Sequence, residues 1–199
     1  MLLSALLFTP FALTGFILVP VYWKPKLFWN LMVGVEDVIF CFITGGIGWL
    51  VSTYGVQHRL MLPGKIRPLI KRYIKYIIFG SISWAIFLFV GFGYLWSTLA
   101  CLYTLGFMLL ITQRCLWPLA LWGAAAFLGF YALILKIMFV SWPHFIQQWN
   151  LPSLFGLVFG LPVEELIWAL GFGFTWPLFM AYVFDVQVRR DAFPVDRPA

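Results

Sequence analysis

The sequence predicts an all-α polytopic membrane protein with about six transmembrane helices, a parallel internal repeat and both termini in the cytoplasm. Hydrophobic residues make up 63% of the 199-residue chain and charged residues only 10%, whereas soluble domains carry about 25% charged residues. Residues 76–113 and 115–135 contain no charged side chain. Runs of about 18 or more apolar residues are typical of helices that span a bilayer. An acidic motif that occurs twice predicts the repeat.

Six apolar segments are long enough to cross a bilayer, and charged or proline-containing stretches separate most of them. The first segment ends at the sequence KPK around Pro25, and the fifth is bounded by Pro118 and Pro143. The sixth begins directly after Pro162, because proline suits the start of a helix. The predicted spans are residues 2–23, 31–53, 73–91, 96–112, 117–139 and 163–184.

The spans form a single transmembrane domain, residues 1–188, which a polar tail at 189–199 follows. Between the fifth and sixth spans, residues 141–161 are partly apolar but interrupted by proline and glycine, which favours an interfacial or re-entrant segment. The remaining divisions are the first half of the repeat at 1–54, a basic loop at 55–72, a linker helix at 73–95 and the second half at 96–188.

Basic residues gather on one predicted side of the membrane. The net charge is +6, but the basic residues lie in short loops between apolar segments, so lipid head groups and topology explain them better than nucleic acid does. With six spans, ten basic residues fall on the side of the termini and about three on the other side. Because cytoplasmic loops carry the excess of Lys and Arg, we expect a multi-pass plasma-membrane protein with both termini inside.

Neither a metal site nor a cofactor is expected. The three cysteines, Cys41, Cys101 and Cys115, show no metal-binding or redox spacing, and we expect buried free thiols. Two histidines are too few for a histidine-rich metal site. No strands are predicted, and no glycine fingerprint of a flavin or nicotinamide domain follows one.

Two acidic pairs stand in matching apolar contexts. The first, Glu36 and Asp37, lies in GVEDVIF at 34–40, and the second, Glu164 and Glu165, lies in PVEELIW at 162–168. These four residues are more than half of the seven acidic residues of the chain. Since an Asp at the centre of a membrane helix costs about 2.5 to 3.5 kcal/mol on insertion scales, acids in such segments are usually functional.

The spacing of the motifs predicts that the two acidic pairs lie on the same side of the membrane. The motifs are 128 residues and four predicted spans apart, and an even number of crossings returns the chain to the same side. Parallel repeats of this kind are related by an axis along the membrane normal, with the binding site at their interface. We therefore predict that the four carboxyl groups face one shared cavity.

The motifs resemble those of the carotenoid lycopene cyclase domain family, in which each half carries a Pro-x-Glu-Glu/Asp pattern. The resemblance rests on 34–40 and 162–168, with Gly34 in place of the family's proline and one helix ahead of the first motif instead of two. It implies a flavin-independent helical membrane enzyme of the lyase or isomerase type, a hydrophobic isoprenoid or carotenoid substrate, and a chain that works alone, as a homo-oligomer or with a second subunit.

The implied chemistry suits paired carboxyl groups. A carboxylic acid protonates a terminal double bond of a polyene, a second double bond attacks the cation, and a base removes a proton. Burial and a neighbouring carboxyl favour the protonated form that an acid needs, and aromatic faces stabilise cations. The candidate catalytic residues are Glu36, Asp37, Glu164 and Glu165, and the candidate substrate-binding residues are Phe40, Trp168 and Phe172.

Other interpretations of the same residues stay open. Acids in the first turn of a helix commonly satisfy free backbone N–H groups, and aromatic residues on membrane helices commonly serve packing. A CAAX-type intramembrane protease also has a Glu-Glu pair, but Ala169 stands where that family has Arg, and no histidine follows Glu165. A proton-coupled transporter or a carotenoid-binding subunit also fits intramembrane acids.

Overall fold

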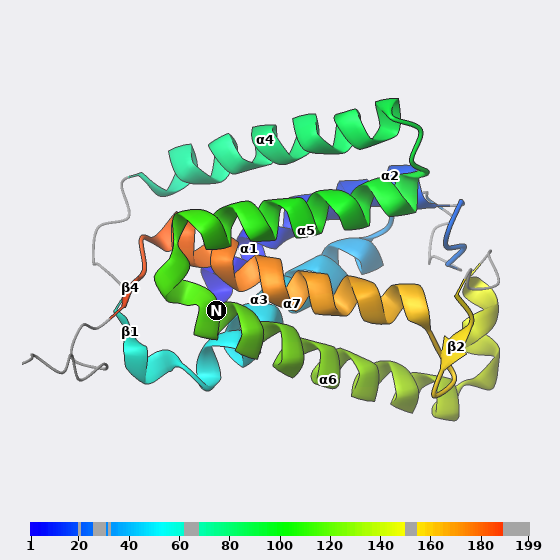
Figure 1. Ribbon diagram of the computed structural model, residues 1–199. Coiled ribbons are helices and arrows are strands. Elements are labelled where there is room, and N and C mark those ends of the chain that lie inside the picture. Colours follow the sequence, from blue (N-terminus) through cyan, green and yellow to red (C-terminus); the bar gives the residue numbers. More distant parts are fainter. Residues whose placement is uncertain (20, 26–30, 32, 62–67, 150–154, 189–199) are drawn as a thin grey trace, which may run out of the picture.

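Five long helices run side by side in the computed structural model, with α7 in the middle of them (Figure 1). The structure describes residues 1–19, 21–25, 31, 33–61, 68–149 and 155–188. The long helices are α3 (Val35–Tyr54), α4 (Leu69–Phe89), α5 (Tyr94–Thr112), α6 (Trp117–Ser141) and α7 (Val163–Phe184).

All five long helices are long and apolar enough to cross a membrane. The prediction of a helical membrane protein is thereby confirmed at the level of its class. The last helix has the bounds predicted for the sixth span, and the other four differ by four residues or fewer at each end.

The first predicted span is shorter and less regular than expected. The segment Leu2–Leu18 is apolar but falls below the length of the five long helices. It divides into α1 (Leu2–Phe8), the 3-10 helix η1 (Thr9–Thr14) and α2 (Gly15–Leu18). Pro10 lies in the first turn of η1, and because proline has no N–H to donate, it interrupts the hydrogen-bond ladder of an α-helix.

The central position of α7 follows from its burial. Within its apolar stretch 72% of the residues are buried, compared with 6% for α4, which packs mainly on α5. The exposed face of α4 carries isoleucines at every fourth position, as expected for a face that contacts lipid tails. These residues are Ile70, Ile74, Ile78, Ile82 and Ile86.

Short irregular elements close the two ends of the bundle. At one end (Figure 1), β1 (Leu60–Met61) follows the 3-10 helix η2 (Gln57–Arg59) and pairs with β4 (Gln187–Val188). The 3-10 helix η3 (Arg114–Leu116) joins α5 to α6. At the other end, η4 (Pro143–Gln148) precedes a tight hairpin of β2 (Leu157–Val158) and β3 (Leu161–Pro162). The expectation of a chain without strands is therefore wrong, although each strand has only two residues.

The hairpin of β2 and β3 occupies the predicted interfacial or re-entrant segment. Its turn holds Phe159 and Gly160 at positive φ, and the Lys136 ammonium donates a hydrogen bond to the carbonyl oxygen of Phe159 at 2.8 Å. The Phe159 side chain is 87% exposed. An exposed apolar turn whose backbone carbonyl group accepts a hydrogen bond from the protein is compatible with the membrane interface.

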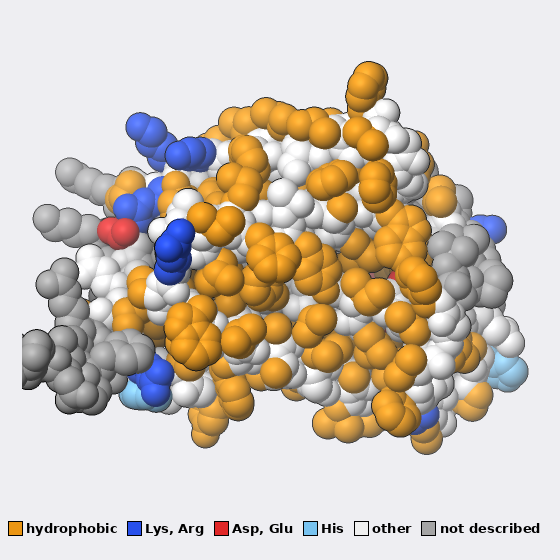
Figure 2. All heavy atoms as spheres, in the orientation of Figure 1, with side chains coloured by type: hydrophobic (Ala, Val, Ile, Leu, Met, Phe, Trp, Pro, Cys, Tyr) orange, Lys and Arg blue, Asp and Glu red, His pale blue; other side chains and the backbone are white. Residues whose placement is uncertain are grey.

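The burial of the cysteines and the placement of the basic residues both bear on the sequence predictions. Cys41 and Cys101 are buried free thiols, as predicted, but Cys115 is exposed, and it lies in the short 3-10 helix η3 between α5 and α6. In Figure 2 the middle of the molecule is covered by hydrophobic side chains, and most Lys and Arg side chains of this face gather at the end that holds β1 and β4.

Candidate active site

The two acidic motifs lie at the same end of two helices that run in parallel. Near their starts, the rings of Phe40 in α3 and Trp168 in α7 are 6.4 Å apart. Near their ends, the rings of Trp49 and Phe184 are 5.4 Å apart. Since both contacts follow the same order along the two helices, the first turns of α3 and α7 point the same way and carry the acidic pairs at one end of the bundle.

Asp37 has a structural role in the first turn of α3. Its Oδ2 atom accepts a hydrogen bond of 2.8 Å from the backbone N–H of Gly34, which is the cap residue of the helix. The Asp37 side chain is buried, with 8% exposed. A carboxylate at this position completes one half of a capping box and also favours the positive end of the helix dipole. This contact matches the ordinary helix-start interpretation of an acidic residue.

Glu165 is held by three side-chain donors from separate parts of the chain. Its Oε1 atom accepts a hydrogen bond from the Tyr22 hydroxyl and another from the Trp149 indole N–H, both 2.9 Å long. Its Oε2 atom accepts one from the Tyr131 hydroxyl at 2.6 Å. An ionised carboxylate accepts all three bonds at once, because it has no proton of its own to place.

The phenol of Tyr22 is kept in its protonated, donating form. Tyr22 follows α2 and lies outside the five long helices. Burial, followed by the negative charge of Glu165 and the hydrogen bond to it, raises the pKa of Tyr22. The phenol therefore stays neutral throughout the physiological range, and the Glu165 carboxylate keeps this donor.

Glu164 and Glu36 occupy different environments. The Glu164 side chain is only 2% exposed, which makes it the most buried of the motif acids. Glu36 is half-buried in the first turn of α3. Buried ionisable groups require nearby polar partners or a protonated form, so the second motif presents a deeply buried carboxyl group beside a carboxylate with fixed partners.

The candidate substrate-binding residues form one aromatic cluster that starts at the acidic end. Trp168 and Phe172 stack at 5.3 Å, and Trp168 also contacts the rings of Phe40 and Tyr131. Phe172 is 1% exposed and packs 4.8 Å from Phe127. Phe172 is therefore a core residue in this conformation, whereas Phe40 has 43% of its surface exposed.

The predicted chamber shared by all four acids stays a prediction. Two cavities found among the described residues lie elsewhere, and none of the four acids lines either of them. The same described residues contain no group of three or more His, Cys, Asp or Glu side chains placed to hold a metal ion.

Tyr22, Tyr131 and Trp149 were missed as site residues by the sequence interpretation. Trp149 lies in the segment 141–161 that the sequence predicts to be interfacial or re-entrant, but its indole has a specific partner in Glu165. Tyr131 gives one usable signal, since a tyrosine within an apolar helix needs a partner for its hydroxyl group. The identity of that partner depends on the packing of α6 against α7, which no local pattern encodes.

The Glu165 contacts predict a measurable difference between two tyrosines. Tyr131→Phe should destabilise the protein by about 1.5 to 3 kcal/mol, because the lost bond reaches a charged group. Tyr103→Phe removes a bond of 2.8 Å to the neutral carbonyl oxygen of Ile167, and such bonds between membrane helices average about 0.6 kcal/mol. Reversible unfolding in mixed micelles with a denaturing detergent measures both. Equal losses would show that the Glu165 carboxylate gains nothing from Tyr131 beyond an ordinary hydrogen bond.

No family model, curated protein or solved structure matches this chain.

Proposed function

We propose that the acidic end of the bundle is the active site of a membrane cyclase, which closes a ring at the end of a linear polyene without net oxidation or reduction. The observation that carries the proposal is the pairing of a deeply buried Glu164 with a Glu165 whose oxygens accept three hydrogen bonds. Two adjacent carboxyl groups in different environments are suited to different roles in proton transfer. The apolar helices around them suit a hydrophobic isoprenoid or carotenoid substrate.

In this proposal Glu164 is the acid that starts the reaction. Its proton adds to one carbon of the terminal double bond and leaves a cation on the other carbon. A second double bond of the same chain supplies the electron pair that closes the new carbon–carbon bond, and the positive charge moves to that second site. Loss of a proton to a carboxylate restores a double bond, so the product is an isomer of the substrate.

The remaining motif residues take supporting roles. Glu165, with its three donors, provides a fixed negative charge near the developing cation. Glu36, on the α3 side of the Phe40–Trp168 contact, is assigned as the base. The faces of Phe40 and Trp168 stabilise the cation by about 2 kcal/mol when water is excluded, without reacting with it.

The orientation in the membrane is part of the same proposal. Described basic residues at the end opposite the acids include Arg59, Lys71, Arg72, Lys75 and Arg114. Because positive charge is retained on the cytoplasmic side, this basic end is assigned to the cytoplasm and the acidic end to the outer half of the membrane.

Expression in cells that accumulate lycopene tests the proposal directly. A cyclase should convert the pigment to products of equal mass with one or two rings, which chromatography and absorption spectra resolve. Lycopene that co-purifies unchanged with the protein identifies a binding protein instead. Pigment that is neither converted nor bound, in cells whose membranes contain the folded protein, contradicts a polyene cyclase that acts alone on this substrate.

A further inference from the structure

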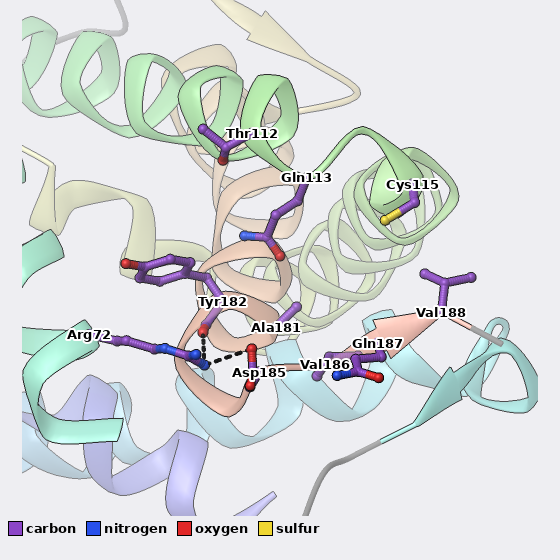
Figure 3. A pocket seen from close by; sticks show the side chains of 10 residues that line it. All are labelled: Arg72, Thr112, Gln113, Cys115, Ala181, Tyr182, Asp185, Val186, Gln187 and Val188. Atoms are coloured by element: carbon purple, nitrogen blue, oxygen red, sulfur yellow. Dashed lines mark hydrogen bonds and ion pairs between the residues drawn. The ribbon is translucent and has the colours of Figure 1, made fainter. Parts of the chain in front are cut away.

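A second polar feature lies at the opposite end of α7 from the acidic motifs. A cavity of about 560 Å³ opens there between α4, the end of α5 and the last turn of α7. Figure 3 shows Arg72, Gln113, Tyr182 and Asp185 around it. Since Glu165 and Tyr182 are 17 residues apart in α7 and an α-helix rises 1.5 Å per residue, this cavity is about 26 Å from the acidic pair of α7 along the helix.

Arg72 provides a partly buried positive charge at the cavity. Its Nη1 atom contacts Asp185 Oδ1 at 2.9 Å and donates to the Tyr182 carbonyl oxygen at 3.3 Å. The guanidinium also lies 5.8 Å from the centre of the Tyr182 ring. Both polar contacts within the described residues use Nη1, so the Nε and Nη2 edge of the planar group remains to bind an anion. The side chain is 25% exposed, which leaves it within reach of a ligand.

Gln113 adds a donor that the described residues do not satisfy. The Nε2 atom is buried, and it has no hydrogen-bond partner among the residues that the structure describes. In Figure 3 the Gln113 side chain extends from the end of α5 toward the last turn of α7. Buried donors without a partner are uncommon and call for an explanation, and an acceptor bound in the cavity supplies one.

We propose that this cavity binds the phosphate group of an anionic lipid head group. A guanidinium edge and a buried amide N–H group are both donors to phosphate oxygens. Lys71 and Arg114 lie on the elements that form the cavity, and basic pockets between membrane helices bind phosphate head groups. Exposed apolar side chains of α5 close to Gln113, Phe107 and Ile111, suit the acyl chains of the same lipid.

Asp185 allows a test of whether the cavity binds a negatively charged ligand. Its carboxylate is half-exposed and pairs with Arg72, so it competes with an incoming anion for the guanidinium. The backbone of Asp185 has φ 59°, a left-handed conformation that asparagine also tolerates. Asp185→Asn therefore removes the competing charge without requiring the chain to change its conformation.

The experiment uses the full-length protein purified in a non-ionic detergent. Short-chain phosphatidic acid, short-chain phosphatidylcholine and inorganic phosphate are titrated separately, and binding is followed by calorimetry. The expected result is saturable binding of phosphatidic acid, weaker binding of inorganic phosphate and no saturable binding of phosphatidylcholine. Inorganic phosphate that binds as tightly as phosphatidic acid would overturn the lipid assignment and identify a site for a soluble anion.

Three variants test whether lipid binding depends on this cavity or only on the positive charge of the protein. Arg72→Gln should weaken phosphatidic acid binding by about tenfold, as expected for loss of a hydrogen bond to a charged group. Lys75→Gln removes the same charge from an exposed position one turn away and should leave the Kd within about twofold. Asp185→Asn should tighten binding several-fold, a gain that misfolding cannot produce. Equal weakening by Arg72→Gln and Lys75→Gln, or weaker binding by Asp185→Asn, would overturn the proposal.

Discussion

Replacing Glu164 with glutamine is expected to abolish ring formation while leaving the protein folded. Glutamine has nearly the same shape as glutamate and keeps a hydrogen-bonding head at a site that is only 2% exposed. It has no carboxylic proton to give, and general acid catalysis contributes about 10²- to 10⁴-fold to enzymatic rates. Since the proposed reaction begins with protonation, cells that make lycopene and express this variant should contain no cyclic product.

The control for Glu164→Gln is an acid-to-amide change elsewhere in the chain. Asp191 belongs to the polar tail that the sequence predicts at 189–199, and Asp191→Asn should form cyclic pigment at the wild-type level. The amount of each protein in the membrane and its unfolding midpoint are measured beside the pigment. Wild-type levels of cyclic pigment from a folded Glu164→Gln protein would show that Glu164 is not the acid that starts the reaction.

The long helices were predictable because their signal is local. Uncharged runs of membrane-spanning length define α4 to α6, and the start of α7 after Pro162 was predicted at the residue where the structure places it. Each of these features depends only on neighbouring residues, since a membrane helix satisfies its backbone hydrogen bonds within its own segment. Pro10 was visible in the same sequence, but the prediction of one continuous first span did not take its effect on the helix into account.

The helices α3 and α7, which carry the two motifs, run in the same direction, but the internal repeat and its topology stay predictions, and the contacts of the acids were not predicted. The contact between Phe40 and Trp168 joins equivalent positions of the motifs, and the number of crossings between them predicted a common direction. Glu165 receives donors from Tyr22 and Tyr131, which are 143 and 34 residues away in the sequence. Such partners follow from how helices pack in three dimensions, and a single sequence contains no periodic signal for them.

The second large effect is expected at the closest approach of two helix backbones. Gly123 of α6 and Gly173 of α7 face each other, and a Cβ atom on Gly173 would collide with the carbonyl oxygen of Gly123. The same atom would lie 2.8 Å from the Cβ of Phe127. Because the obstacle is backbone, it cannot rotate away as a flexible side chain does, and small residues are what permit such close helix contacts in membranes.

Gly173→Ala should therefore lower the free energy of unfolding by about 3 kcal/mol, at the upper end of the range for overpacked cores. Gly129→Ala is the matched control, because a Cβ on this glycine of α6 meets no atom within 4 Å. It should change the stability by about 1 kcal/mol or less, in the stabilising direction, since alanine favours a helix over glycine. Detergent-denaturation curves of both variants measure these changes in the free energy of unfolding. Equal effects would mean that α6 and α7 have room to separate, and that the position of Glu165 relative to Tyr131 does not depend on this glycine contact.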